Sequence, residues 1–176
     1  MLKEAQWIVA ATVALVAGYT DWRSRRIPNW LTVPGLLAGV AANALAGGWP
    51  GTKDSLLGAG LGLALLLPFV VIRALGAGDW KLVGALGASL GLRHLPTVLV
   101  VTVLVNGLIA LGMIIWKRRV LQTLRNFAHM LAAVLTLHLP GPTLTLDNPD
   151  AVKVPFGVAA AIAVVLCTAQ HAWGLS

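Results

Sequence analysis

Asp21 and Asp79 are the acidic residues of this sequence that are best placed to do chemistry. They lie 58 residues apart, and each stands at the end of an apolar segment. At a membrane boundary a carboxylate is costly unless it is paired, solvated or functional. Pairing with Arg23, Arg25 or Lys81 would make both residues structural. If they meet, two carboxyl groups share a proton over a useful pH range, which suits the activation of water or the binding of an ion.

The remaining polar residues predict no metal ion and no cofactor. The other four acids fall in expected tails and loops, where we expect a solvated surface: Glu4, Asp54, Asp147 and Asp150. The histidines lie on different segments without metal-ligand spacing: His94, His129, His138 and His171. The single cysteine, Cys167, excludes a disulfide framework within one chain. Asn106 and Cys167 fall inside apolar segments, where we expect them to pack against neighbouring helices.

The composition indicates an integral membrane protein. Hydrophobic residues make up 58% of the 176 residues and charged residues 11%, and the mean hydropathy is +0.84. A soluble domain carries about 25% charged residues, so lipid must be the solvent for much of this surface. We expect an all-α fold in one membrane-embedded domain covering residues 1–176. Its six transmembrane helices are predicted at about 5–20, 29–47, 55–75, 78–92, 95–116 and 154–173.

The basic residues predict the orientation of these helices. With six spans, ten of the thirteen lysines and arginines fall on one side, which is the cytoplasm by the positive-inside rule. Both termini are therefore expected outside, and the net charge of +7 needs no nucleic-acid partner. All seven tryptophans lie near predicted span ends, as interfacial indoles do. An apolar stripe over 120–138 predicts an amphipathic helix on the cytoplasmic surface, followed by a loop over 140–150.

The segments around the two aspartates contain further informative residues. Gly76 and Gly78 precede Asp79 at alternate positions, and glycine permits unusual backbone angles and close approach of another chain. Pro28, followed by Asn29, is suited to the start of the next helix. Gly58 and Gly62, like Gly87 and Gly91, are spaced four apart, which favours close helix packing.

These motifs resemble the GxGD aspartic proteases of the type IV prepilin peptidase family, peptidase A24. The resemblance rests on the Asp21 segment ending in Ile27-Pro28-Asn29, on Gly76-Ala77-Gly78-Asp79-Trp80-Lys81-Leu82, and on Val154-Pro155-Phe156-Gly157. It implies that Asp21 and Asp79 are the catalytic pair, which acts through an activated water without metal or cofactor. It also implies supporting roles for Gly76, Gly78, Lys81, Pro28 and Asn29, with Lys81 either favouring ionised Asp79 or anchoring the topology.

The resemblance also implies a substrate and a location. The substrate is a prepilin or pseudopilin, whose basic leader is cut after a glycine at the cytoplasmic face of the bacterial inner membrane. Membrane lipid is a further partner, and the pilus assembly or secretion machinery is an indirect one. The single cysteine leaves no paired-cysteine insertion, so the chain looks like the short CpaA/TadV form of tight-adherence (Flp) pili. For the same reason, N-methylation is not expected.

Two other functions are compatible with the pair of acids. A small transporter or channel-like protein could use Asp21 and Asp79 to bind ions or protons, since paired intramembrane acids also mark ion pathways. Such a pathway should cross the bilayer, whereas both acids are predicted on one side. A presenilin-like GxGD protease is the second alternative, but its Pro-Ala-Leu segment is absent from the sequence.

Overall fold

Every secondary-structure element of the described residues is an α-helix, which confirms the all-α prediction. The computed structural model describes residues 2–116 and 154–174. Its helices are α1 (Leu2–Ser24), α2 (Asn29–Val71), α3 (Ala77–Trp116) and α5 (Phe156–Ala172). The predicted surface helix at 120–138 and the loop at 140–150 lie outside the described residues.

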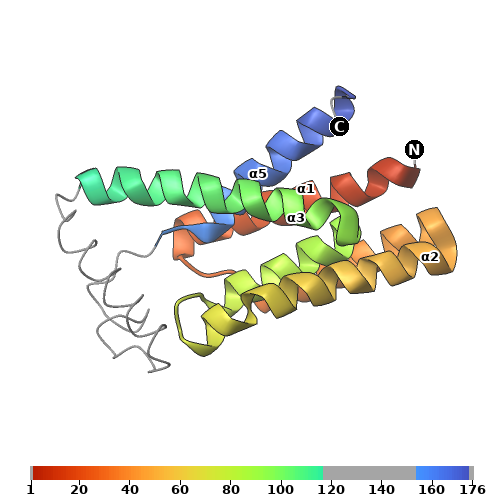
Figure 1. Ribbon diagram of the computed structural model, residues 1–176, viewed down its shortest axis with the longest axis horizontal. Coiled ribbons are helices and arrows are strands. Elements are labelled where there is room, and N and C mark those ends of the chain that lie inside the picture. Colours follow the sequence, from red (N-terminus) through yellow and green to blue (C-terminus); the bar gives the residue numbers. More distant parts are fainter. Residues whose placement is uncertain (1, 117–153, 175–176) are drawn as a thin grey trace.

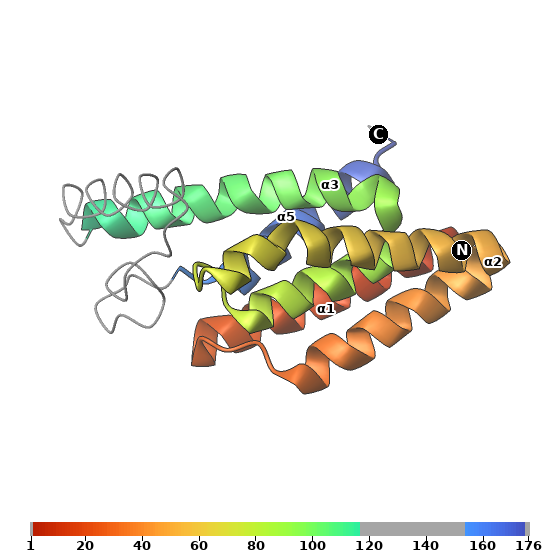
Figure 2. The same cartoon turned by 60° about the horizontal axis from the view of Figure 1, so that its bottom comes forward.

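Helices α2 and α3 each fold back on themselves at a glycine. Gly48 has φ of 59° and Gly91 has φ of 69°, and glycine enters this left-handed region at little cost. Figures 1 and 2 show that each helix consists of two arms running in opposite directions. The arms are residues 29–47 and 49–71 in α2, and residues 77–90 and 92–116 in α3.

These helical ranges overlap the predicted apolar segments, although the second arm of α2 covers 49–71 where 55–75 was predicted. By length and composition α2 and α3 are apolar enough to cross a membrane, and α5 is a shorter apolar helix. At 1.5 Å per residue the two arms of α2 are about 28 and 34 Å long, close to the hydrocarbon thickness of about 30 Å. The predicted boundary near residue 47 therefore coincides with the turn at Gly48.

The first arm of α3 is the centre of the bundle. Every residue from Leu82 to Gly91 is buried, so this arm is covered by protein on all sides. Its neighbour in α2 approaches closely, because a side chain on Gly58 would collide with the carbonyl of Gly87. This arm is only about 21 Å long by the same rise per residue, yet its burial means that it need not face lipid along its length.

The outer faces of the long helices expose large apolar side chains. Leu45, Leu108 and Leu111 are among them, and so extended an apolar surface indicates a non-aqueous neighbour. Five tryptophans at helix ends or turns are likewise exposed: Trp22, Trp30, Trp49, Trp116 and Trp173. Trp7 differs from the interfacial expectation, because it is buried and packs against His94 and His171.

The bundle has two unlike ends. In Figure 1 the N- and C-termini lie at one end, together with the turns at Gly48 and Gly91. The opposite end gathers the last turn of α1, the end of α2, and the starts of α3 and α5 (Figures 1 and 2). Because Asp21 and Asp79 belong to those segments, helix reversal brings both to the same end.

Candidate active site

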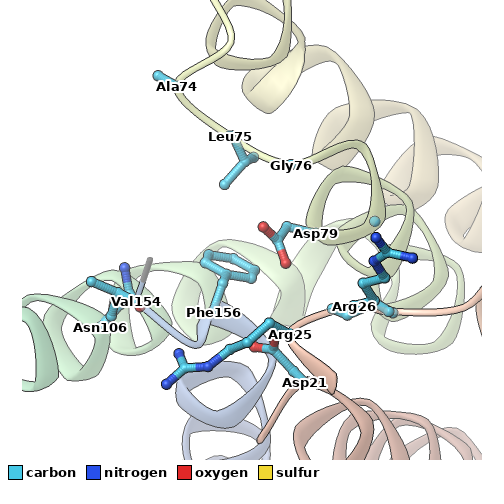
Figure 3. A pocket seen from close by; sticks show the side chains of 12 residues that line it. Asp21, Arg25, Arg26, Ala74, Leu75, Gly76, Asp79, Asn106, Val154 and Phe156 are labelled. Carbon is cyan, nitrogen blue, oxygen red and sulfur yellow. The ribbon is translucent and has the colours of Figure 1, made fainter. Parts of the chain in front are cut away.

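One pocket contains both predicted catalytic residues. It has a volume of about 520 Å³ and is lined by the end of α1 and the segment after it, the loop before α3, and the start of α5. Figure 3 shows the carboxyl groups of Asp21 and Asp79 turned toward this pocket from different helices. Of the residues expected to support them, Gly76 and Gly78 also line it.

Asp21 is held by a backbone donor from the far end of the chain. The N–H of Gly157 donates a hydrogen bond of 2.8 Å to Asp21 Oδ2. Glycine is required by the packing here, since a Cβ at position 157 would lie 2.9 Å from the Cβ of Asp21 and 3.0 Å from the carbonyl oxygen of Ala17. The Val154-Pro155-Phe156-Gly157 segment therefore completes the surroundings of the first aspartate.

The environment of Asp21 acts on its charge in opposing directions. Asp21 lies beyond the apolar segment at 5–20 and is 6% exposed. Burial raises the pKa of the Asp21 carboxyl above its ordinary value, whereas the Gly157 N–H and the Arg25 charge oppose that rise. Arg25 ends the helix with φ of 53° and lines the same pocket.

Asp79 lies in the first turn of α3. The carbonyl of Gly76 accepts a 3.1 Å hydrogen bond from the N–H of Trp80 at the start of this helix. A helix N-terminus favours negative charge, but the charge of Asp21 also acts on Asp79. Two carboxylates that interact in one pocket resist simultaneous ionisation, so the site favours the singly protonated pair.

The two glycines before Asp79 provide space and not unusual backbone angles. Neither Gly76 nor Gly78 has a positive φ, which corrects that part of the expectation. A Cβ on Gly78 would lie 3.1 Å from the carbonyl oxygen of Ile27, and one on Gly76 would lie 3.0 Å from Asp79 Oδ2. Gly78 thus lets the segment after α1 pack against the start of α3.

Lys81 contacts Asn29 and not Asp79. Its Nζ donates a 2.9 Å hydrogen bond to Asn29 Oδ1, which ties the start of α3 to the start of α2. Pro28 immediately precedes α2 in an extended conformation, and its carbonyl accepts the N–H of Leu31 at 3.1 Å. Pro28, Asn29 and Lys81 do not line the pocket. They hold the segment after Asp21 against the start of α3, the helix that carries Asp79.

Several residues of the pocket wall, Phe156 and Asn106 among them, were not predicted as site residues. Phe156, at the start of α5, and Asn106, in the second arm of α3, both line the pocket with the aspartates (Figure 3). Asn106 was expected only to pack against another helix. The polar side chain within an apolar run was the available signal, but the run does not reveal which way that side chain faces.

The opposite end of the bundle gathers polar residues that the sequence placed on separate segments. The rings of His94 and His171 have centroids 6.1 Å apart, and Trp7 lies 5.2 Å from each. Glu4 Oε1 is 3.8 Å from His171 Nε2. Within residues 2–116 and 154–174, no group of three acidic, histidine or cysteine side chains could hold a metal ion.

Asp54, at that same end, has a structural role that the sequence did not suggest. We expected a solvated loop residue, but Asp54 lies within α2. Its Oδ1 accepts the N–H of Leu92 at 3.2 Å, directly after the turn at Gly91. Asp54 therefore caps the second arm of α3, because the first N–H groups of a helix have no partner within it.

Comparison with known proteins gives a family for this arrangement. The sequence profile described as the type IV leader peptidase family matches residues 8–115, a range that includes Asp21 and Asp79. A "Prepilin leader peptidase/N-methyltransferase" of Aeromonas hydrophila is 33% identical over 118 residues, which cover 63% of this chain and 39% of the relative. The protein of that name from Neisseria gonorrhoeae is 30% identical over 125 residues, covering 64% and 43% respectively.

The matches cover most of this chain but less than half of each relative. The chain spans about two fifths of the length of these relatives, and no solved structure matches it significantly. The profile covers well over half of the chain and both segments that carry an aspartate of the pocket. On that match, the chain belongs to the type IV leader peptidase family.

Proposed function

We propose that this protein is a membrane-embedded aspartic endopeptidase that removes the leader peptide of type IV prepilins. The observation that carries the proposal is the meeting of Asp21 and Asp79 in one pocket, from segments 58 residues apart. Membership in the type IV leader peptidase family supports the same function. The two carboxyl groups are the proposed catalytic groups.

The chemistry follows from a pair that holds one proton. The ionised carboxyl accepts a proton from water as the water oxygen attacks the scissile carbonyl carbon, while the protonated carboxyl donates a hydrogen bond to the carbonyl oxygen. The C–N bond then breaks, and the leaving nitrogen takes up a proton from the pair. Because the two carboxyls titrate together, the proposal gives the acid and base roles to the pair.

The proposed topology has six helical segments crossing the bacterial inner membrane. Both termini would lie outside and the pocket would face the cytoplasm. Supporting this, Arg25 and Arg26 line the pocket, and Arg23, Arg73 and Lys81 also belong to that end of the bundle. By the positive-inside rule this end faces the cytoplasm, where the junction between a basic leader and an apolar helix would lie.

The proposed substrates are Flp-type prepilins or pseudopilins, cut after a glycine at that junction. The single cysteine and the resemblance to the short CpaA/TadV form support this choice. N-methylation of the product is not part of the proposal.

Ion transport is less well supported by the packing behind the two acids. A transport path would continue from the pocket toward the opposite end of the bundle. Along that direction the first arm of α3 contributes Leu82, Val83 and Leu86, all almost fully buried. Such a core favours a site that is entered from one end, which suits peptide hydrolysis.

The test is to co-express the chain with an Flp-type prepilin and follow removal of the leader by gel mobility and mass spectrometry. Asp21→Asn and Asp79→Asn should each slow cleavage at least about a hundredfold, since each removes a proton-transfer group. Glu4→Gln is the matched control, because it removes a carboxyl at the other end of the bundle. Undiminished cleavage by either aspartate variant, at equal amounts in the membrane, would reject the pair.

A further inference from the structure

Among the described residues, the wall of the active-site pocket contains a neutral polar side chain, Asn106, that the proposed chemistry does not use. Asn106 reaches the pocket from the second arm of α3, and Figure 3 shows it on the side of Phe156 away from Asp79. Its neighbours in sequence are apolar, from Val103 to Val105 and from Gly107 to Leu111. An amide in such a run calls for a specific explanation.

The amide oxygen of Asn106 has no partner. Asn106 Oδ1 is buried and accepts no hydrogen bond in the described structure. A buried polar atom without a partner destabilises the fold, and native proteins satisfy nearly all of them. A residue kept for packing would be expected to bond to a neighbouring helix, as was predicted for Asn106 from the sequence.

Asn43 shows what a structural asparagine looks like in the same bundle. Its Nδ2 lies 3.0 Å from the carbonyl oxygen of Gly39, 2.9 Å from that of Ala88 and 2.8 Å from that of Ser89. That amide joins α2 to the first arm of α3. Asn106 Oδ1 makes no such contact in the described structure, and the residue lines the pocket of the two aspartates.

We propose that Asn106 is a substrate-positioning residue, whose Oδ1 accepts a hydrogen bond from a backbone N–H of the peptide segment next to the scissile bond. An extended peptide brings unpaired N–H groups into the pocket, and each needs an acceptor once water is displaced. The side-chain oxygen of an asparagine supplies one regardless of the substrate side chain. This inference rests on the proposed function.

The arrangement of the pocket explains why the acceptor comes from this arm. Asp21 and Asp79 approach the scissile bond from α1 and from the start of α3, while Asn106 lies across the pocket on the second arm of α3. The peptide would therefore be held on one side by the amide and cut on the other by the acids. Asn106 touches the backbone and does not exchange protons.

The first experiment compares Asn106→Leu with the wild type in purified protein, using a synthetic peptide that spans the leader junction. We expect KM to rise about fivefold to tenfold, as for one lost hydrogen bond, with kcat within about twofold. Thermal stability should stay the same or increase, because the change removes an unsatisfied buried atom. Asn106→Gln should restore part of the affinity. Leu108→Ala, on the opposite face of the helix, is the control.

Chemical removal of the donor provides the sharper test. A series of peptides, each N-methylated at one backbone position, should include one that binds the wild type about as weakly as Asn106→Leu binds the unmodified peptide. The Asn106→Leu variant should bind that methylated peptide as well as it binds the unmodified peptide, since both changes remove the same hydrogen bond. Additive losses at every position would overturn the assignment, as would an unchanged KM or a stability loss that Asn106→Gln does not repair.

Binding is also measured in an Asp21→Asn background, by fluorescence of the labelled peptide, so that the inference does not depend on turnover. If the peptide binds and Asn106→Leu weakens binding while the wild type shows no cleavage, the proposed function fails and the positioning role stands. If the wild type cleaves and Asn106→Leu binds equally well, only the positioning role fails. If no peptide binds, both are rejected.

Discussion

Two polar residues at one end of the helical bundle differ in their hydrogen bonding from two at the other end. At the end with the termini, Asn43 and Asp54 have hydrogen-bond partners across helices. At the pocket end, Asp21 accepts the N–H of Gly157, and the Asn106 side-chain oxygen has no partner. Since satisfied groups rigidify a fold and unsatisfied ones are costly, Asn43 and Asp54 serve stability, whereas Asp21 and Asn106 are available to a ligand. The end with the termini also holds two buried atoms without a partner, Trp7 Nε1 and His171 Nδ1.

The pH profile is the strongest test of this contrast. A pair that works with one proton should give a bell-shaped dependence of kcat/KM on pH, falling about tenfold per unit on each side. At low pH both carboxyls are protonated and the base is lost. At high pH both are ionised and the acid is lost. Because burial raises the pKa of Asp21, the low-pH limb should lie above the ordinary carboxyl value of about 3.9.

A control for that profile is the same measurement on Glu4→Gln, which should leave both limbs in place. A profile that keeps rising as the pH falls below about 4 would contradict the shared proton.

Gly157→Ala should have the next largest effect, confined to the pocket end. The added Cβ would lie 2.9 Å from Asp21 Cβ, so α1 and α5 must separate and the hydrogen bond to Asp21 must weaken. We expect kcat to fall about tenfold to a hundredfold, as misplacement of a reacting group by about 1 Å does. Steady-state cleavage of a prepilin peptide measures it.

The matched control is Gly60→Ala, where an added Cβ meets nothing within 4 Å. That change should leave activity intact and can increase helix stability slightly. Equal activity of the two variants would mean that the Gly157 contact does not position Asp21.

Asn43→Leu should have the opposite effect to Gly157→Ala: it should lower the stability of the end with the termini and leave cleavage largely intact. It leaves the carbonyls of Ala88 and Ser89 without their donor, so the free energy of unfolding should fall by about 1–3 kcal/mol. Denaturation in detergent measures the change, with Leu45→Ala on the exposed face as control. If Asn43→Leu left stability unchanged and abolished cleavage, the division between the two ends would be wrong.

Lys81→Met should have the smallest effect. Lys81 bonds to Asn29 at a site open to solvent, and such contacts contribute about 1 kcal/mol or less. We expect cleavage to slow by about fivefold or less, and the double variant with Asn29→Ala to be no worse than either single one. A shift of the pH profile in Lys81→Met alone would instead show that Lys81 acts on Asp79.

Local sequence patterns predicted the all-helical fold, and the catalytic roles of Asp21 and Asp79 stay a prediction. Apolar runs predicted the helical segments, and the distribution of basic residues predicted that Asp21 and Asp79 lie at one end. The hydrogen bond from Gly157 joins residues 136 positions apart, and no local period encodes such a contact. The same limit hid the grouping of Trp7, His94 and His171, and the partner of Asp54.

The sequence also does not reveal which way a single side chain points within an apolar helix. Asn106 and Asn43 are both asparagines within apolar runs, and only the packing of the arms shows that one is satisfied and the other free. Gly91 was read as a small packing residue, but its positive φ makes it the turn of α3.

The bond between Asp21 and Gly157 also sets an order of events during synthesis. The first aspartate leaves the ribosome long before its donor, and Phe156, which walls the pocket, is made just before that donor. Until α5 docks, Asp21 of a growing chain lacks the hydrogen bond from Gly157. The proposed peptidase activity should accordingly arise only after α5 has docked against α1.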